Sequence, residues 1–150
     1  MEQKDKLLIK GKLHIQLFGE DGKLKDERFV ENTVTALGDA YVADCVVGGA
    51  ATYMGWMAVG TGTPSATALG VELDRNALTS TTQGTGGDDN DAIYVGDWAA
   101  ADGTGAITEA GVFNQATLGG TMFISASFAV INKGASDTLK ITWTVTMGST

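Results

Sequence analysis

Hydrophobic and polar residues alternate near both ends of the chain. Apolar residues or glycine take the odd positions from Leu7 to Leu17, and Lys10, Lys12, His14 and Gln16 stand between them. Residues 139–147 repeat the pattern, with one lysine and three threonines on the polar side. A period of two is typical of a strand with one buried face. Both segments are therefore predicted to be strands that share a core.

The residues after the first strand predict a hairpin. Asp21 and Gly22 form an Asp-Gly pair, which is a strong signal for a tight turn between antiparallel strands. A return strand is expected over residues 23–30. The N-terminal hairpin, residues 6–30, is also a possible docking arm.

The hydrophobic period changes after the hairpin. Val34, Leu37, Tyr41 and Cys45 follow one another at helical spacing, which predicts one short helix near residues 33–47. Asn32, Thr33 or Thr35 is expected to cap its start, and two glycines follow its end. Cys45 lies on the apolar stripe, so its thiol is expected to be buried.

The remainder of the chain predicts short strands and turns. Strands are expected over residues 56–59, 71–82, 93–98, 107–113 and 122–130, the last with apolar residues at its even-numbered positions. The 21 glycines are about twice the average share of roughly 7%, which fits many tight turns. The predicted fold class is mostly β: a single domain over residues 1–150 that forms an antiparallel β-sandwich. A jelly-roll-like strand order is compatible with this pattern.

Charge is distributed unevenly along the chain. Residues 1–31 contain seven of the ten basic and seven of the 18 acidic residues, so the remainder accounts for the net charge of −8. Such an acidic body argues against nucleic acid as a partner, because phosphate binding depends on lysine and arginine. No apolar run is long enough for a membrane span, and no signal-peptide core follows Met1, so synthesis in a host cytoplasm is expected.

Few residues in the sequence suggest catalysis. His14 is the single histidine and is interpreted as a surface residue, and one cysteine with one histidine makes a zinc site implausible. The glycine-rich run at residues 60–65 lacks the lysine of a phosphate-binding loop and is interpreted as a structural turn. No enzyme activity, cofactor or metal is predicted. The remaining enzymatic alternative is a glycan hydrolase that uses Asp97 and Glu109.

Three further hypotheses concern individual side chains. The acid-rich loop at residues 84–91 offers oxygen ligands for calcium, although an ordinary solvated loop explains the same residues. Trp98 is the aromatic residue expected at the surface, where it could contribute to a glycan-binding module. Glu109 is a candidate ion-pair partner for Arg75.

Three segments resemble signature regions of a family of small phage and prophage virion proteins. They are MGWMAVGTGT at residues 54–63, GAITEAGVFN at 105–114, and VINKGASDTL at 130–139, which continues into ITWTV. Their order and spacing also match, as does the opening hairpin. The resemblance implies a structural role without catalytic residues.

This resemblance favours a capsid decoration (cement) protein on the outer surface of the virion. Its expected partners are the major capsid protein or other virion proteins, together with copies of itself, preferably in a trimer. The alternative is a tail-associated component such as a fibre, baseplate or adaptor protein. The predicted partner-binding residues are Lys6, Leu7, Ile9, Lys10 and Lys12.

Overall fold

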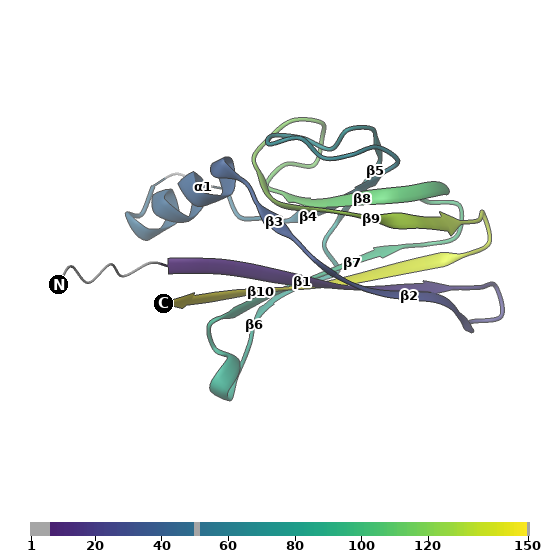
Figure 1. Cartoon of the computed structure of the whole chain (residues 1–150), viewed down its shortest axis with the longest axis horizontal. Coiled ribbons are helices and arrows are strands. Elements are labelled where there is room, and N and C mark those ends of the chain that lie inside the picture. Colours follow the sequence, from purple (N-terminus) through teal and green to yellow (C-terminus); the bar gives the residue numbers. More distant parts are fainter. Residues whose placement is uncertain (1–6, 50–51, 150) are drawn as a thin grey trace.

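The computed structural model describes residues 7–49 and 52–149, which form two antiparallel five-stranded sheets packed face to face (Figure 1). Sheet A contains, in spatial order, β2 (Leu24–Glu31), β1 (Leu7–Phe18), β10 (Thr138–Ser149), β7 (Asp91–Trp98) and β6 (Ser80–Gln83). Sheet B contains β3 (Thr33–Val34), β9 (Met122–Lys133), β8 (Gly105–Phe113), β4 (Trp56–Gly60) and β5 (Glu72–Ala77). The predicted β-sandwich with one short helix is confirmed.

The strand order keeps pairs of consecutive strands together. Strands β1 and β2, β4 and β5, β6 and β7, and β8 and β9 are neighbours within one sheet. Strand β10 returns between β1 and β7, and it pairs with β1 along its whole length, from Leu7 opposite Ser149 to Phe18 opposite Thr138. The predicted N-terminal hairpin is therefore an integral part of sheet A.

The core lies between the sheets and confirms the inward positions predicted for the first and last strands. Sheet A contributes the odd-numbered side chains of β1 and β10, and sheet B contributes apolar side chains of β4, β8 and β9. The main buried members are Leu13, Ile15, Leu17, Leu139, Ile141, Trp143, Val145, Met57, Val59, Val112, Ile124 and Ile131. Burial of this apolar area is the main stabilising contribution to the fold.

The helix α1 (Ala36–Val46) packs on β9, where Tyr41 contacts the ring of Phe123. Thr35 caps it, because its hydroxyl accepts the N–H of Gly38 at 2.8 Å and donates to the carbonyl oxygen of Met122 at 2.6 Å. A side chain at Gly38 would overlap the carbonyl oxygen of Phe123, so the glycine permits this close approach. None of the helical segments in the described part of the chain has the length and apolarity of a membrane-spanning helix.

The prediction of a buried Cys45 is wrong, because this residue is exposed. Contacts with the core come from Tyr41 and Val42. The later turns of α1 project beyond the end of sheet B, as Figure 1 shows. The predicted stripe was thus correct in its period but extended too far along the helix.

The single strand predicted over residues 71–82 is two strands in different sheets. Strand β5 belongs to sheet B and β6 to sheet A. The change occurs at two adjacent residues: Leu78 donates its N–H to the carbonyl oxygen of Gly55, and Thr79 donates to that of Val95. Both strands lie at sheet edges, where polar residues are tolerated on both sides. The sequence of this segment is therefore polar throughout and does not show where one strand ends and the next begins.

The alternation predicted for residues 122–130 holds only in part. Ile124 and Ala126 face the core, but Val130 is exposed and Ile131 is buried. The ladder between β8 and β9 is irregular between Ile107 and Glu109, which shifts the alternation. Phe123 is buried as well, because α1 covers the other face of β9 there.

Candidate functional site

The outer surfaces of the two sheets differ. The outer side of sheet B is covered by α1 and by the two loops at residues 61–71 and 114–121, which lie above this sheet in Figure 1. A second apolar cluster fills the space beneath the loops, formed by Ala58, Leu69, Phe113 and Met122 with Trp56 packed against it. Sheet B is thus closed by the chain itself.

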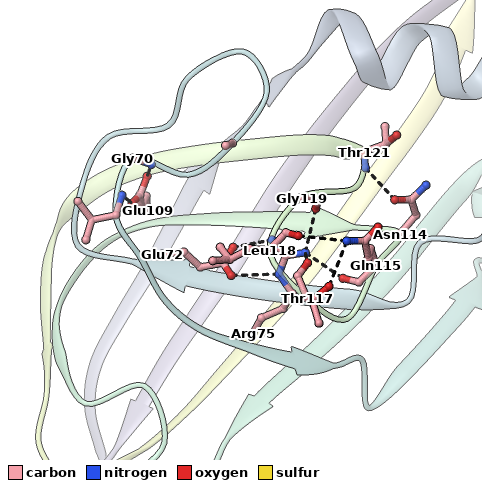
Figure 2. Close-up of polar contacts among 12 residues, drawn as sticks. Gly70, Glu72, Arg75, Glu109, Asn114, Gln115, Thr117, Leu118, Gly119 and Thr121 are labelled. Atoms are coloured by element: carbon pink, nitrogen blue, oxygen red, sulfur yellow. Dashed lines mark hydrogen bonds and ion pairs between the residues drawn. The ribbon is translucent and has the colours of Figure 1, made fainter.

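Glu109 fixes the first loop. Its side chain is fully buried, and its carboxylate accepts the N–H groups of Gly62 at 2.9 Å, Gly70 at 2.8 Å and Val71 at 2.8 Å. Figure 2 shows this carboxylate beside Gly70. Backbone N–H groups that converge in a glycine-rich loop form an anion site. Here the protein's own carboxylate fills it, which fits the interpretation of residues 60–65 as a structural turn.

Arg75 fixes the second loop. Its guanidinium binds the Glu72 carboxylate at 2.6 and 3.2 Å. It also donates to three carbonyl oxygens of the loop, those of Gln115, Thr117 and Gly119, at 2.7–3.2 Å (Figure 2). The guanidinium carbon lies 3.7 Å from the centroid of the Phe113 ring. The predicted pair of Arg75 and Glu109 is therefore wrong: Arg75 pairs with Glu72, three residues away.

The outer side of sheet A lacks a comparable cover among the described residues. We call this surface the open face. It consists of the side chains that point away from sheet B, and its middle is rich in threonine and β-branched residues. Its members include Lys10, Lys12, His14, Gln16, Glu27, Phe29, Glu31, Lys140, Thr142, Thr144, Thr146, Asp91, Ile93, Val95, Asp97, Ser80 and Thr82.

A hollow lies at one side of the open face, where β2 turns away from β1. We call it the β1 notch; it is lined by Ile9, Lys10, Gly11, Lys12, His14, Phe29, Glu31, Asn32, Thr142, Thr144 and Thr146. Strand β2 pairs with β1 only from Lys12 onward, opposite Glu31, and the chain then crosses to sheet B. The last backbone bond across this pair runs from the N–H of Asn32 to the carbonyl oxygen of Gly11 at 3.1 Å.

The backbone of β1 has a free edge beyond this bond. In an antiparallel ladder, backbone groups point alternately to the two neighbouring strands. Because the carbonyl of Gly11 points toward β2, the N–H and C=O groups of Leu7 and Ile9 point the same way. Met147 lies opposite Ile9, but it exchanges hydrogen bonds with Asn90 on its far side. The Ile9 backbone groups therefore find no partner within the described residues.

Asn32 determines where β2 leaves β1. Its side-chain oxygen accepts the indole N–H of Trp143 at 2.7 Å, and its side chain crosses directly over Gly11 to do so. Trp143 is fully buried, so its N–H needs this acceptor. A β-carbon on Gly11 would overlap the Asn32 side chain, which explains the glycine inside a strand.

Replacing Gly11 by alanine is expected to lower the free energy of unfolding by about 2 kcal/mol, because Asn32 must move and the buried Trp143 N–H loses its acceptor. Urea denaturation followed by tryptophan fluorescence measures this change. Gly148→Ala is the matched control: it lies in β10, and nothing lies within 4 Å of the position of its β-carbon. Equal stabilities of the two variants would contradict this role of Asn32.

Lysines and an exposed aromatic ring give the notch its chemistry. Phe29 is 61% exposed and stacks on His14, with the ring centroids 4.4 Å apart. His14 also contacts the Glu27 carboxylate at 2.8 Å, and the Lys12 amine lies 5.5 Å from the Phe29 centroid. Among the described residues, neither Lys10 nor Lys12 forms an ion pair. The notch thus combines these two lysines and an apolar platform with one carboxylate, that of Glu31, which lies opposite Lys12 in the strand pair.

The predicted partner-binding residues lie around this notch in different ways. Lys10 and Lys12 are exposed on the open face and line the notch, whereas Ile9 lines it from the inner side and packs partly on the core. Leu7 is 60% exposed at the start of β1, and Lys6 lies outside the described residues. The prediction omitted Phe29 and Asn32. An aromatic residue on the charged side of the return strand was the available signal for Phe29.

The inner side of β2 carries a separate ion pair. Arg28 binds both oxygens of Asp26, at 2.9 and 3.0 Å, and this contact holds the pKa of Asp26 below its ordinary value. The same guanidinium reaches toward the carbonyl oxygens of Ala129 and Val130 in sheet B at 3.4 Å. It therefore links the two sheets beside the notch, away from the open face.

The structure separates the residues considered for other chemistry. Trp98 is buried, so the expected surface position is wrong: Tyr94, Gly96 and Trp98 alternate toward the core. Asp97 lies on the outer side of sheet A, while Glu109 lies beneath the loop on the outer side of sheet B. These two carboxylates therefore do not form a catalytic pair.

Other titratable groups take part in structural contacts. In the described chain, no three His, Cys, Asp or Glu side chains gather as metal ligands. Asp91 of the acid-rich loop accepts the hydroxyl of Thr146 at 2.6 Å. Lys133 is buried and donates to the carbonyl oxygen of Ala99 at 3.0 Å, and burial lowers the pKa of its amine. Burial also raises the pKa of Tyr94 to about 12.

Comparison of the chain with models of protein families, with curated proteins and with solved structures finds no match.

Proposed function

We propose that this chain is a structural protein of a bacteriophage virion, and specifically a capsid decoration protein that binds the outer surface of the head. The observation that carries this proposal is the asymmetry of the sandwich. Sheet B is closed by its own helix and loops, whereas sheet A presents the open face and the free edge of β1. The resemblance of the three sequence segments to virion proteins supports the choice of particle.

The open face is suited to binding the shell in many copies, because each contact loses little conformational entropy. Its threonines and β-branched side chains form a flat surface with little conformational entropy to lose on contact. Many copies, each with a modest interface, stabilise a shell because their contacts act together.

Self-association into a trimer belongs to the same proposal. Exposed apolar side chains near the end of α1 are available for it: Val46, Val47 and Tyr53.

The binding of purified protein to separated parts of the virion tests this function. Heads and tails are prepared from particles of the encoding phage that lack this protein, and each is mixed with the labelled chain. We expect saturable binding to heads, at a copy number set by the shell lattice, and a higher temperature of head disruption. Binding confined to tails would favour a tail-associated component, and binding to neither part would contradict the virion assignment.

A further inference from the structure

We propose that the free edge of β1 at the notch binds an extended, acidic segment of another protein as an added β-strand. This inference rests on the proposed function, since it describes how the chain holds its virion partner. The added strand would continue the line of β2, in the place that β2 leaves when it crosses to sheet B after Glu31. A strand edge with free donors and acceptors is a template for such pairing.

The backbone groups available at this edge are specific. Ile9 and Leu7 direct their N–H and C=O groups toward the vacant side, as the bond from Asn32 to Gly11 and the position of Met147 indicate. Other edges of the sandwich are less suitable. Strand β2 carries the charged run of Lys25, Asp26, Glu27 and Arg28, and β6 is only four residues long. Charged and short edge strands resist pairing.

The charge of the notch selects the incoming segment. Glu31 of β2 already lies opposite Lys12, so on the open face an added strand would place alternate side chains beside Lys10 and Leu8, with Lys12 as a diagonal neighbour. A carboxylate beside Lys10 would meet a lysine that has no ion pair among the described residues, and opposite charges across strands stabilise pairing. The chain has a net charge of −8, so an acidic segment would be repelled from most of its surface and directed to this notch.

A second copy of this chain is a poorer occupant of the same edge. Two copies paired through β1 would bring their two sets of lysines, Lys10 and Lys12, close together. Like charges placed across strands destabilise pairing. The partner is therefore expected to be a different chain with an acidic extended segment.

Peptide binding tests the edge directly. The probe is a short synthetic peptide that alternates valine and glutamate, and the control peptide alternates valine and lysine. Binding is followed by amide resonances of the full-length protein at low salt. The acidic peptide is expected to shift the amides of Leu7 and Ile9 and to protect them from hydrogen exchange, and the basic peptide is expected to leave both unchanged. Unchanged amides with the acidic peptide would overturn the proposal.

Two pairs of variants identify the groups responsible. Ile9→Pro removes the N–H that faces the vacant side and no bond to β10, and is expected to abolish peptide binding. Ile9→Ala retains the N–H and is expected to bind. Changing Lys10 and Lys12 together to glutamate is expected to weaken binding at least about tenfold, whereas Lys140→Glu, on the same face outside the notch, is expected to have little effect. Equal binding by all four folded variants would contradict strand addition.

The same variants separate this inference from the proposed function. If the wild-type chain binds heads and Ile9→Pro binds them equally well, the function stands and strand addition is wrong. If the wild-type chain binds the acidic peptide at Ile9 but neither heads nor tails, the edge is a docking site and the virion assignment is wrong. Formation of dimers that Ile9→Pro abolishes would assign the edge to a second copy instead.

Discussion

Replacing Glu109 by alanine is expected to lower the free energy of unfolding by about 4 kcal/mol, the largest effect of any single substitution considered. The carboxylate is fully buried and accepts three backbone N–H groups from the loop at residues 61–71. Alanine leaves these donors without an acceptor, and each buried, unsatisfied group costs about 1–3 kcal/mol. In a protein of this size, the loss corresponds to a fall in the melting temperature of roughly 8–16 °C.

Glutamine at position 109 keeps the volume of the side chain but replaces one of its two acceptor oxygens. The N–H groups of Gly62 and Val71 both bind one oxygen of Glu109, and Gly70 binds the other. The amide oxygen of glutamine can still accept the N–H groups of Gly62 and Val71. Its NH₂ group, however, would face the N–H of Gly70, so that two donors meet without an acceptor. Glu109→Gln is therefore expected to cost about 2 kcal/mol.

Urea denaturation measures both changes at Glu109, with Glu20→Gln in the exposed first turn as the control. The control is expected to change stability by less than about 0.5 kcal/mol. If Glu109→Ala were no less stable than this control, the carboxylate would not hold the loop. If Glu109→Ala accelerated amide exchange only in the loop at residues 61–71 and left the free energy of unfolding unchanged, the contribution of Glu109 to global stability would also be contradicted.

Replacing Arg75 by alanine is expected to lower the free energy of unfolding by about 3 kcal/mol and to release the loop at residues 114–121. The side chain is only 5% exposed, and it binds Glu72, three loop carbonyl oxygens and the face of the Phe113 ring. Its removal leaves Glu72 without its cation in a nearly buried position, and breaking a buried ion pair costs about 3–5 kcal/mol. Rearrangement of the exposed loop recovers part of this cost.

Lysine at position 75 tests the guanidinium geometry. An ammonium group keeps the charge, but it lacks the planar fork that reaches the carboxylate and the loop carbonyls together. Arg75→Lys is therefore expected to cost about 2 kcal/mol and to accelerate amide exchange over residues 114–121. The matched control is Arg28→Lys, whose ion pair with Asp26 is about one-third exposed and is expected to cost less than about 1 kcal/mol. Unchanged exchange in the loop of Arg75→Lys would contradict this role.

The elements predicted most accurately are those in which local pattern and tertiary burial agree. In β1 and β10 one face meets the core and the other meets solvent, so the alternation of residues 7–17 and 139–147 identifies both strands and their inward sides. The same alternation placed Lys10 and Lys12 on the outer side. The outward position of these two lysines thus follows from the sequence.

The errors arose where long-range contacts determine the structure. The crossover at Leu78 and Thr79 depends on acceptors in Gly55 and Val95, which are remote in the sequence. Glu109 was predicted to pair with Arg75, whereas its actual partners are backbone groups of a distant loop. The surface position predicted for Trp98 rested on the small residues that follow it. The alternation of β7, in which Tyr94, Gly96 and Trp98 face the core, indicates the buried side instead.

The shape of the notch also depends on such contacts. Strand β2 leaves β1 where Asn32 reaches over Gly11 to Trp143, which lies 111 positions further along the chain. Residue patterns within the N-terminal hairpin contain no information about that partner. The sequence therefore predicted the first strand and its outward lysines but not the edge that β2 leaves beside it.

Cryo-electron microscopy of the intact virion tests the central claim most directly. The proposed function predicts density for this sandwich repeated over the outer surface of the head, with the open face and the β1 notch turned toward the shell and an added strand beside Ile9. Density at a few positions on the tail, or an orientation with sheet A toward solvent and sheet B on the shell, would contradict the account.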